Sequence, residues 1–476
     1  MLNQFRNGFF YTVLGQYGNM IITFLINIVL SRLLTPSDYG TVAVVSVFII
    51  FFQMLADMGI GPAIIQNKEL DELEIAKIFN ISGIFSLILS VIFLGVGYIL
   101  SVIYKNEIYI TLSRILAIAV FFYSIIVVPM AKLKKEKNFK MINISLIISS
   151  LIGGSIGVTF ALLGFGVYSL VINSVISSLI NFLILLKKSK LRLTKIVDFS
   201  PLTKIYGFAS NQFAFNFFNY FSRNIDSFLI GKYISPAALG NYNKSYQLLM
   251  YPAAVFNGII NPVLQPILSD YEEDVETIRD VYFNLVHILL LFGMPISIFM
   301  SSCSQEIVFF LFGQQWIDSI FPLKMLSLTI WIQVINITTS AIYQSRNKTK
   351  YLLLNGILSS LIIVGSILCG LYFKNIQAVS ISLAIGFFIN FLCSISILLY
   401  KVLDSKWSSI ISFFISPIII SFFIFMALFI FQYQFSFLVS NNFLLLLIQG
   451  IIFIVVLFTG FLLTKEYRYI LKFFKR

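Results

Sequence analysis

Long apolar segments separated by short polar breaks run along the whole chain. Each segment is close to the roughly 20 residues that an α-helix needs to cross the hydrocarbon core of a bilayer. The pattern therefore predicts an all-α integral membrane protein with about fourteen transmembrane helices. The expected segments are 9–30, 41–66, 78–103, 109–131, 141–163, 166–186, 208–231, 238–265, 282–303, 320–344, 351–373, 376–400, 409–431 and 442–464.

A short phrase that ends one apolar segment and precedes the next occurs twice, two hundred residues apart. S-R-L-L-T-P-S-D-Y-G stands at 31–40 and G-K-Y-I-S-P-A-A-L-G at 231–240, so that Gly40 matches Gly240. Chance is one explanation, because Pro and Gly are frequent turn residues. The other is a membrane protein built from two related halves, as is common among secondary transporters.

The predicted first and seventh helices each carry a row of polar side chains on one face. A spacing of three or four residues places such a row on one side of a helix. Lipid cannot satisfy hydrogen bonds, so both rows must face other helices or water. Interhelical hydrogen bonding is one explanation, but because five positions recur in both helices we favour a water-filled central cavity. The rows are Thr12, Gln16, Asn19, Thr23 and Asn27, and Gln212, Asn216, Asn219, Arg223 and Ser227.

Only the second row carries charge. Arg223 has Asp226 one turn later, whereas Thr23 and Ile26 occupy the matching positions of the first half. An ionisable group at the bilayer centre costs roughly 2.5 to 3.5 kcal/mol, so it needs a partner or a function. Mutual neutralisation at i,i+3 is one explanation. The other is that Arg223 holds a phosphate and that Asp226 releases it when a proton or cation arrives.

Asp57 is a second acidic residue within a predicted helix. It lies in M-L-A-D-M-G-I-G-P-A, where Gly59, Gly61 and Pro62 weaken the helix, and Asn257 is its counterpart. Freed carbonyls beside a carboxylate are suited to coordinate a cation or proton. A kink capped by a protonated Asp57 is the alternative, and the sequence does not separate the two.

Two further rows of polar residues follow in the second half. The first lies on the predicted eighth helix and the second on the tenth, and each by itself is explained by helix packing. Together they place most of the polar lining in the second half. The candidate binding residues that they add are Lys244, Gln247 and Asn257, and Gln333 and Asn336.

Composition and charge agree with a membrane chain. Apolar residues make up 59 % and charged residues 11 % of the 476 residues, unlike any soluble domain. Most of the 33 basic residues fall in alternate gaps and at both ends, which predicts that both termini are cytoplasmic. The net charge of +13 then belongs to the inner face of a membrane and not to a nucleic-acid groove.

Several enzyme motifs are incomplete in the sequence. G-N-Y-N-K-S at 240–245 lacks the glycine that a phosphate loop has before its lysine. The single histidine, His287, has no nucleophile motif beside it, so we expect a buried helix residue. The three cysteines lack the spacing of metal ligands. We therefore expect a protein that is not an enzyme and has neither a cofactor nor a metal.

Several motifs in order resemble one family of exporters. S-R-L-L-T-P-S-D-Y-G, L-A-D-M-G-I-G-P-A-I-I-Q at 55–66, S-R-N-I-D-S-F-L-I-G-K-Y at 222–233, A-A-L-G-N-Y-N-K-S-Y-Q-L at 237–248 and L-F-G-Q-Q-W at 311–316 are similar to those of Wzx-like polysaccharide flippases. These belong to the multidrug/oligosaccharidyl-lipid/polysaccharide (MOP) exporter superfamily. The resemblance implies two six-helix lobes around a cavity, with two further helices. We expect lobes at 1–190 and 191–400, and the additional helices and a basic tail at 401–476.

The resemblance also implies a function. It implies alternating-access transport of an undecaprenyl-pyrophosphate-linked oligosaccharide from the inner to the outer leaflet of the bacterial cytoplasmic membrane, driven by a proton or sodium gradient. The lipid II flippase of this superfamily has cavity arginines in its first lobe, where this chain has an uncharged row. The resemblance therefore favours capsule, exopolysaccharide or O-antigen (lipopolysaccharide) synthesis, with a polymerase and a chain-length regulator as partners. A polysaccharide polymerase and a drug/cation antiporter are the alternatives.

Overall fold

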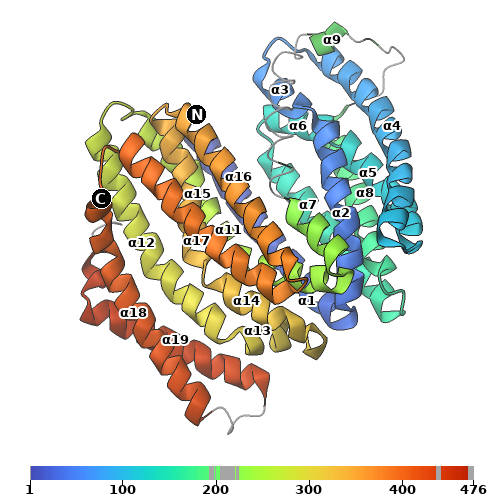
Figure 1. The fold of residues 1–476 in the computed structure, drawn as a ribbon. Helices are drawn as coiled ribbons and strands as arrows, with labels where there is room; N and C mark the ends of the chain where they lie inside the picture. The colour runs from blue at the N-terminus through green and yellow to red at the C-terminus, as the bar shows by residue number, and fades with distance from the viewer. Residues whose placement is uncertain are drawn as a thin grey trace. The chain divides into compact units, whose positions relative to one another are not determined.

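The structure is a computed structural model that describes residues 2–191, 198, 200–203, 220, 224–435 and 441–469. Every regular element in these residues is a helix (Figure 1). Among them, 11 helices are long and apolar enough to cross a membrane, or 12 when the pair Gln314–Ser327 and Ile330–Ser345, bent by 54°, counts as one span. The chain is therefore an all-α, multi-pass membrane protein, as the sequence pattern predicts.

Twelve of the expected segments coincide with these spans. The expected segment 208–231 lies mostly outside the described residues. The expected segment 238–265 lies within α11, Pro236–Ser269, which is helical but is not among the apolar candidates. The count of about fourteen thus stays a prediction.

The chain divides into two compact units, Met1–Gly240 and Asn241–Arg476. These units are defined by how densely the residues contact one another. The expected division into lobes at 1–190 and 191–400 and a tail region at 401–476 stays a prediction. Residues 224–233 of the first unit are helical, and the first turn of α11 also belongs to it. Its other helices are α1 Leu2–Leu33, α2 Pro36–Asp57, α3 Ile60–Gln66, α4 Glu72–Tyr104, α5 Ile108–Ile125, α6 Val127–Lys135, α7 Phe139–Leu162, α8 Tyr168–Ser189 and α9 Ser200–Thr203.

The repeated phrase is a helix start in both copies. Thr35 caps α2 by accepting the Asp38 N–H at 3.2 Å, and the Asp38 carboxylate accepts the Thr35 N–H at 2.9 Å. Ser235 accepts the Ala238 N–H at 3.1 Å at the start of α11. A proline follows each cap, where its missing N–H costs nothing. The phrase therefore breaks the helical run and starts the next helix in each half.

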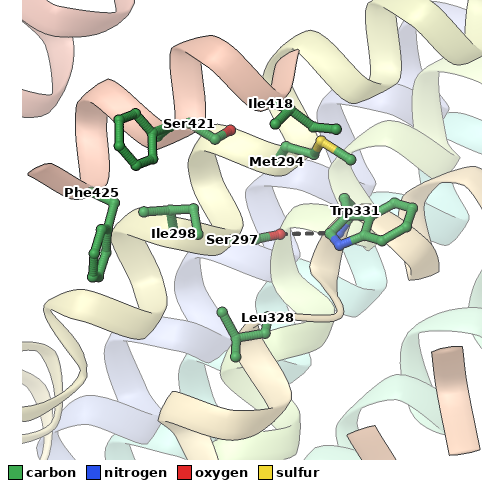
Figure 2. A pocket seen from close by; sticks show the side chains of 9 residues that line it. Met294, Ser297, Ile298, Leu328, Trp331, Ile418, Ser421 and Phe425 are labelled. Atoms are coloured by element: carbon green, nitrogen blue, oxygen red, sulfur yellow. Dashed lines mark hydrogen bonds between the residues drawn. The ribbon is translucent and has the colours of Figure 1, made fainter. Parts of the chain in front are cut away.

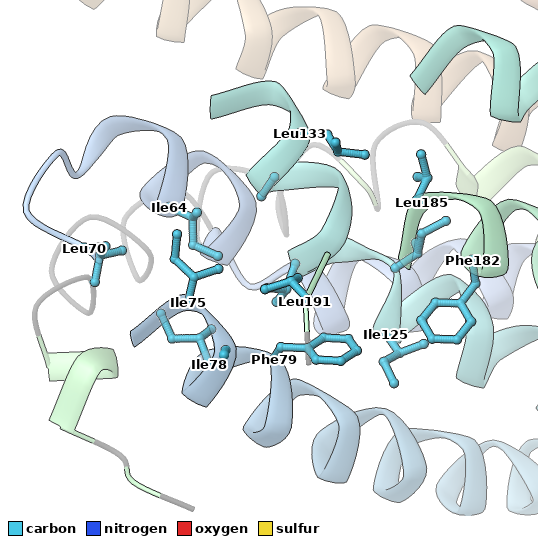
Figure 3. Packing of buried hydrophobic residues seen from close by; sticks show 14 of the residues in the cluster. Ile64, Leu70, Ile75, Ile78, Phe79, Ile125, Leu133, Phe182, Leu185 and Leu191 are labelled. Atoms are coloured by element: carbon cyan, nitrogen blue, oxygen red, sulfur yellow. The ribbon is translucent and has the colours of Figure 1, made fainter. Parts of the chain in front are cut away.

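A buried apolar cluster holds one end of the first unit together (Figure 3). It joins α3, α4, α5, α6 and α8, and its members are almost fully removed from solvent. Lys135 of α6 donates to the carbonyl oxygens of Asn67 at 2.9 Å and Leu70 at 3.2 Å, which fixes the α3–α4 connection over this cluster. Its central side chains are Ile64, Leu70, Ile75, Ile78, Phe79, Ile125, Leu133, Phe182, Leu185 and Leu191.

In the second unit, α12 packs against α14, α15 and α18, and α19 packs against α18 and α13 (Figure 1). Trp331 of α15 contacts Phe391 of α17, with ring centroids 4.9 Å apart. After α11, the helices are α12 Val275–Ser302, α13 Ser304–Leu311, η1 Gln314–Ser319, α14 Ile320–Ser327, α15 Ile330–Ser345, α16 Thr349–Tyr372, α17 Ile376–Lys401, α18 Trp407–Gln434 and α19 Asn442–Leu463.

Candidate functional site

The polar row of α1 lies on the side of the helix opposite its exposed apolar row. Leu14, Ile21 and Leu25 are 53 %, 55 % and 55 % exposed, and their spacing of seven and four puts them on one face. The polar positions lie about half a turn away by the same period. One face of α1 is therefore suited to contact lipid, and the opposite face is suited to contact protein or water.

Three of the candidate residues on this row differ in their contacts. Asn19 accepts a hydrogen bond from the Ser150 hydroxyl of α7 at 2.7 Å. Asn27 donates to the Thr23 carbonyl oxygen of its own helix at 2.9 Å, and Gln16 is exposed. The row thus combines interhelical bonding at Asn19 with an accessible amide at Gln16, and the water-filled cavity stays a prediction.

The matching row of the second half is largely outside the described residues. This applies to Arg223, Asn216 and Asn219. Asp226 is described and half-buried, and its carboxylate accepts the Ser227 N–H at 2.7 Å. The pairing of Arg223 with Asp226 therefore stays a prediction. The Tyr220 hydroxyl donates to the Val47 carbonyl oxygen, which ties Tyr220 to α2.

Asp57 lies at the break between α2 and α3. Met58 and Gly59 adopt left-handed conformations, with φ of 37° and 75°, and α3 starts at Ile60. The Asp57 carboxylate accepts the Gly61 N–H at 3.2 Å. The weakening of the helix expected from the glycines is confirmed as a break, with Gly59 as the N-cap of α3 and the Asp57 carboxylate accepting one N–H of its first turn. A role of Asp57 in ion binding stays a prediction.

Lys244 of α11 is buried, with 2 % of its surface exposed. Its ammonium lies 5.1 Å from the Phe312 ring centroid and 5.6 Å from that of Trp316. Beside it, the Ser319 hydroxyl donates to the Asn241 side-chain oxygen at 2.7 Å. This cation–π arrangement fastens the L-F-G-Q-Q-W motif to α11. It favours a structural role for Lys244 over direct contact with a substrate.

The other candidates of α11 are more accessible. The Gln247 amide donates to the Tyr251 hydroxyl at 3.1 Å, one turn further along. Asn257 is exposed. Both side chains therefore offer amide groups on the surface of the helix.

α15 places Gln333 and Asn336 three residues apart on one face. The Gln333 Nε2 and the Asn336 Oδ1 are buried atoms without a hydrogen-bond partner. Such atoms are costly in a protein interior unless water or a ligand satisfies them. This observation supports a polar binding function for these two residues.

Asn390 of α17 is a candidate that the sequence analysis missed. Its Oδ1 is also buried and without a partner, and α17 packs against α15. The available signal was a single amide inside the apolar run G-F-F-I-N-F-L at 386–392. A polar residue in such a run is expensive and points to a function.

An apolar cavity of about 380 Å³ opens between α12, α18 and the break between α14 and α15 (Figure 2). The Ser297 hydroxyl accepts the Trp331 N–H at 3.1 Å and donates to the Gly293 carbonyl oxygen at 2.7 Å. The Ser297 hydroxyl thus already donates and accepts one hydrogen bond within the protein. The remaining wall is suited to hydrocarbon and not to sugar, and is formed by Met294, Ile298, Leu328, Ile418, Ser421, Phe422 and Phe425.

The candidates thus fall into two groups, one in each compact unit. Gln16, Asn19, Asn27, Asp57 and Asp226 belong to the first unit. Lys244, Gln247, Asn257, Gln333 and Asn336 belong to the second. A common site formed by both groups stays a prediction.

Solved structures of transporters share this fold. The lipid II flippase MurJ, in an inward closed conformation, superposes with a TM-score of 0.73 at 14 % identity, covering 96 % of this chain and 98 % of that chain. An inward-facing multidrug resistance MATE transporter of the MOP superfamily gives a TM-score of 0.62 at 16 % identity, over 79 % and 92 % of the two chains. At these identities the likeness establishes the fold.

The sequence is also similar to curated bacterial proteins, two of which are named for the biosynthesis of surface polymers. The teichuronic acid biosynthesis protein TuaB of Bacillus subtilis is 24 % identical over 296 residues, 60 % of each chain. An uncharacterised membrane protein in the cps region of Klebsiella pneumoniae is 24 % identical over 440 residues, 86 % of this chain and 85 % of that one. The lipopolysaccharide biosynthesis protein WzxC of Escherichia coli is 22 % identical over 312 residues, 63 % and 61 %. The chain spans about 60 % of the length of TuaB and WzxC.

The profile of one family, described as polysaccharide biosynthesis protein, matches residues 29–322. This match covers more than half of the chain and includes the helix starts of both repeated phrases and the whole of α11. The protein therefore belongs to the polysaccharide biosynthesis protein family, and the predicted resemblance to the polysaccharide exporters of the MOP superfamily is confirmed.

Proposed function

We propose that the protein is a secondary transporter that carries an undecaprenyl-pyrophosphate-linked oligosaccharide repeat unit from the inner to the outer leaflet of the bacterial cytoplasmic membrane. The observation that carries the proposal is the family match over residues 29–322, together with the fold of a lipid II flippase over 96 % of the chain. The product serves capsule, exopolysaccharide or O-antigen synthesis. Both termini lie on the cytoplasmic side, as the distribution of basic residues favours.

The substrate's three parts have different chemical requirements. The pyrophosphate needs a cation, and Arg223 is the one that the sequence places in mid-helix. The sugars need amide donors and acceptors. The unsatisfied atoms of Gln333 and Asn336 and the accessible amide of Gln16 support this role. The polyprenyl tail remains in lipid.

Coupling needs a group whose charge changes during the cycle. Asp57 and Asp226 are the acidic residues that the sequence analysis places within predicted transmembrane segments of the first unit, and a proton or sodium ion is the proposed coupling ion. Binding at either carboxylate shifts the equilibrium between inward-facing and outward-facing states only if the ion binds one state more strongly. Alternating access of the two lobes then follows from the ion gradient.

Removal and replacement of the gene test the proposed function. In a strain that lacks the gene, lipid-linked repeat units should accumulate in the inner leaflet. Mass spectrometry identifies the accumulated lipid, and a membrane-impermeant glycan-degrading enzyme applied to spheroplasts reports which leaflet contains it. Wild-type protein should restore outward delivery. Accumulation of polymerised lipid-linked chains, or no change in lipid-linked sugars, contradicts the proposal.

Arg223→Ala tests the pyrophosphate contact. It should reduce outward delivery by roughly a hundredfold, the loss expected for a charge-assisted bidentate contact of about 3 kcal/mol. Arg223→Lys keeps the charge and should lose less. Arg114→Ala is the matched control, because Arg114 donates to the Tyr98 hydroxyl at 2.9 Å and lies over its ring. Full delivery by Arg223→Ala removes Arg223 from the substrate site.

A drug/cation antiporter is the second candidate function. The fold that this chain shares with a multidrug resistance MATE transporter is compatible with this function. Efflux of cationic dyes by the wild-type protein, together with normal lipid-linked sugars in the deletion strain, would favour this function.

A further inference from the structure

The single histidine of the chain is buried in the second unit with both ring nitrogens engaged. His287 of α12 is 5 % exposed, and Glu466, three residues after the end of α19, is 9 % exposed. The His287 Nδ1 lies 2.8 Å from the Phe413 carbonyl oxygen of α18. The His287 Nε2 lies 3.0 Å from the Glu466 Oε2. One imidazole therefore connects three elements.

The partners on the two sides of the ring fix the number of protons. A backbone carbonyl oxygen only accepts, so Nδ1 must carry a hydrogen in order to bond to Phe413. A carboxylate oxygen also accepts, so the Nε2 contact requires a second proton, either on Nε2 or on Glu466. Both contacts exist together only when the histidine and the glutamic acid hold this second proton between them.

Loss of the second proton breaks one of the two contacts. A neutral ring with its hydrogen on Nδ1 turns the Nε2 lone pair toward the Glu466 carboxylate, which is repulsive. A neutral ring with its hydrogen on Nε2 turns the Nδ1 lone pair toward the Phe413 oxygen instead. No tautomer of the unprotonated pair satisfies both partners, and an unsatisfied buried polar group costs about 1 to 3 kcal/mol.

The surroundings of the ring make it a closed site. The Tyr469 ring packs edge-on against the imidazole, with centroids 4.8 Å apart, and its hydroxyl donates to the Asn284 side chain of α12. Burial raises the pKa of Tyr469 to about 12, so this residue stays neutral. Glu466 bonds to the ring and Tyr469 packs against it.

We infer that His287 and Glu466 form a proton-binding site that fastens residues 464–469 to α12 and α18. With the proton bound, the segment is docked; when the proton leaves, the segment is released. This inference does not depend on the identity of the transported lipid. The bound species is a proton, and the consequence is a C-terminal segment whose docking follows the pH on the side of the membrane where it lies.

The chain offers two direct measurements of this site. Because there is one histidine, protein labelled with ¹⁵N-histidine, prepared without a polyhistidine tag in nanodiscs, gives the spectrum of His287 alone. Lys465 and Arg468 are exposed and flank Glu466, so trypsin followed by mass spectrometry of the released peptides measures docking. Raising the pH should remove the second proton from the pair, and the ¹⁵N resonance of Nε2 should change when it does. At the higher pH, cleavage after Lys465 should be roughly tenfold faster in the wild type than in Glu466→Gln, a comparison that cancels the pH dependence of trypsin itself.

Three variants separate the proton site from ordinary packing. Glu466→Gln can donate its amide N–H to Nε2 of a neutral ring, so the segment should stay docked at every pH. His287→Phe should expose Lys465 at every pH, because Phe413 and Glu466 lose their partner. Tyr469→Phe removes the bond to Asn284, so cleavage should be faster but should keep its pH dependence. Wild-type cleavage that is independent of pH, or an unchanged pH dependence in Glu466→Gln, would overturn the inference.

Discussion

Gly40 and Gly240 each lie against the backbone at the start of the other's helix. A Cβ on Gly40 would come within 1.6 Å of the Pro236 carbonyl oxygen, and a Cβ on Gly240 within 2.0 Å of the Pro36 carbonyl oxygen. All four residues belong to the first compact unit. The two copies of the repeated phrase therefore cross each other at matching glycines. This reciprocal contact favours two related halves over chance repetition of the phrase.

The first prediction is that either glycine resists substitution. Gly40→Ala and Gly240→Ala should each destabilise the protein by about 3 kcal/mol or more, because a backbone carbonyl cannot move aside as a side chain can. The measurement is the amount of monodisperse protein after detergent extraction, with its thermal unfolding midpoint. Gly95→Ala is the control, since no atom lies within 4 Å of a Cβ there. Normal yield of both variants would mean that the crossing is not tight in the membrane.

The second prediction separates the two roles of Asp57. Asp57→Asn retains an oxygen that accepts the Gly61 N–H, so the α2–α3 break should fold normally, but it removes the charge. We expect normal protein levels and transport that no longer responds to an imposed proton or sodium gradient. Asp57→Ala should also lower stability by about 1 kcal/mol through loss of the cap.

Asp38→Asn is the matched control for Asp57. Like Asp57, the Asp38 carboxylate accepts a backbone N–H at the start of a helix, in this case that of Thr35 before α2. It should leave the gradient response intact. If Asp57→Asn keeps that response as well, capping is the whole role of Asp57 and the coupling ion binds elsewhere.

The third prediction concerns acid. The Asp198 carboxylate accepts the Ser200 N–H at 2.9 Å and pairs with Lys77 of α4 at 2.9 Å. These contacts lower the pKa of Asp198 from 3.8 to about 2. The hydrogen bond from the Ser200 backbone contributes most, and the bond from Lys77 comes next. A lowered pKa means that the carboxylate stabilises the fold above about pH 4, and that this contribution disappears as the pH falls toward 2.

The measurement for Asp198 is the difference in Tm between the wild-type protein and Asp198→Asn as a function of pH. The wild type should melt at a higher temperature above about pH 4, and the difference should shrink toward pH 2. Glu69→Gln, at an exposed carboxylate, should show no such trend. A difference in Tm that does not vary with pH would show that Asp198 acts through its neutral contacts alone.

The helices could be predicted because their signals are local. Apolar length identified twelve spans, and the repeated phrase marked the boundary between two of them, where Thr35 starts α2 with a capping box. The eighth segment is helical in α11 but is not among the apolar candidates, because polar residues such as Asn257 lower its mean hydropathy. Local pattern also identified the break at Asp57 from Gly59 and Gly61.

The contacts of the candidate residues could not be predicted in the same way. Asn19 bonds to Ser150 across 131 positions, and His287 meets Glu466 across 179. Lys244 was placed on a polar face, but its ammonium lies over Phe312 and Trp316. Such partners are set by helix packing, which periodicity within one helix does not report.

The last prediction tests the unsatisfied atoms of α15. Asn336→Leu removes a buried oxygen that has no partner, so the fold should be unchanged or more stable by about 1 kcal/mol. If Asn336 binds sugar, outward delivery of repeat units should fall roughly tenfold despite this. Thr338→Val is the control, because the Thr338 hydroxyl is already bonded to the Ile335 carbonyl oxygen at 2.7 Å. A variant that is more stable and equally active would assign Asn336 to helix packing, whereas loss of delivery in a well-folded protein assigns it to the substrate.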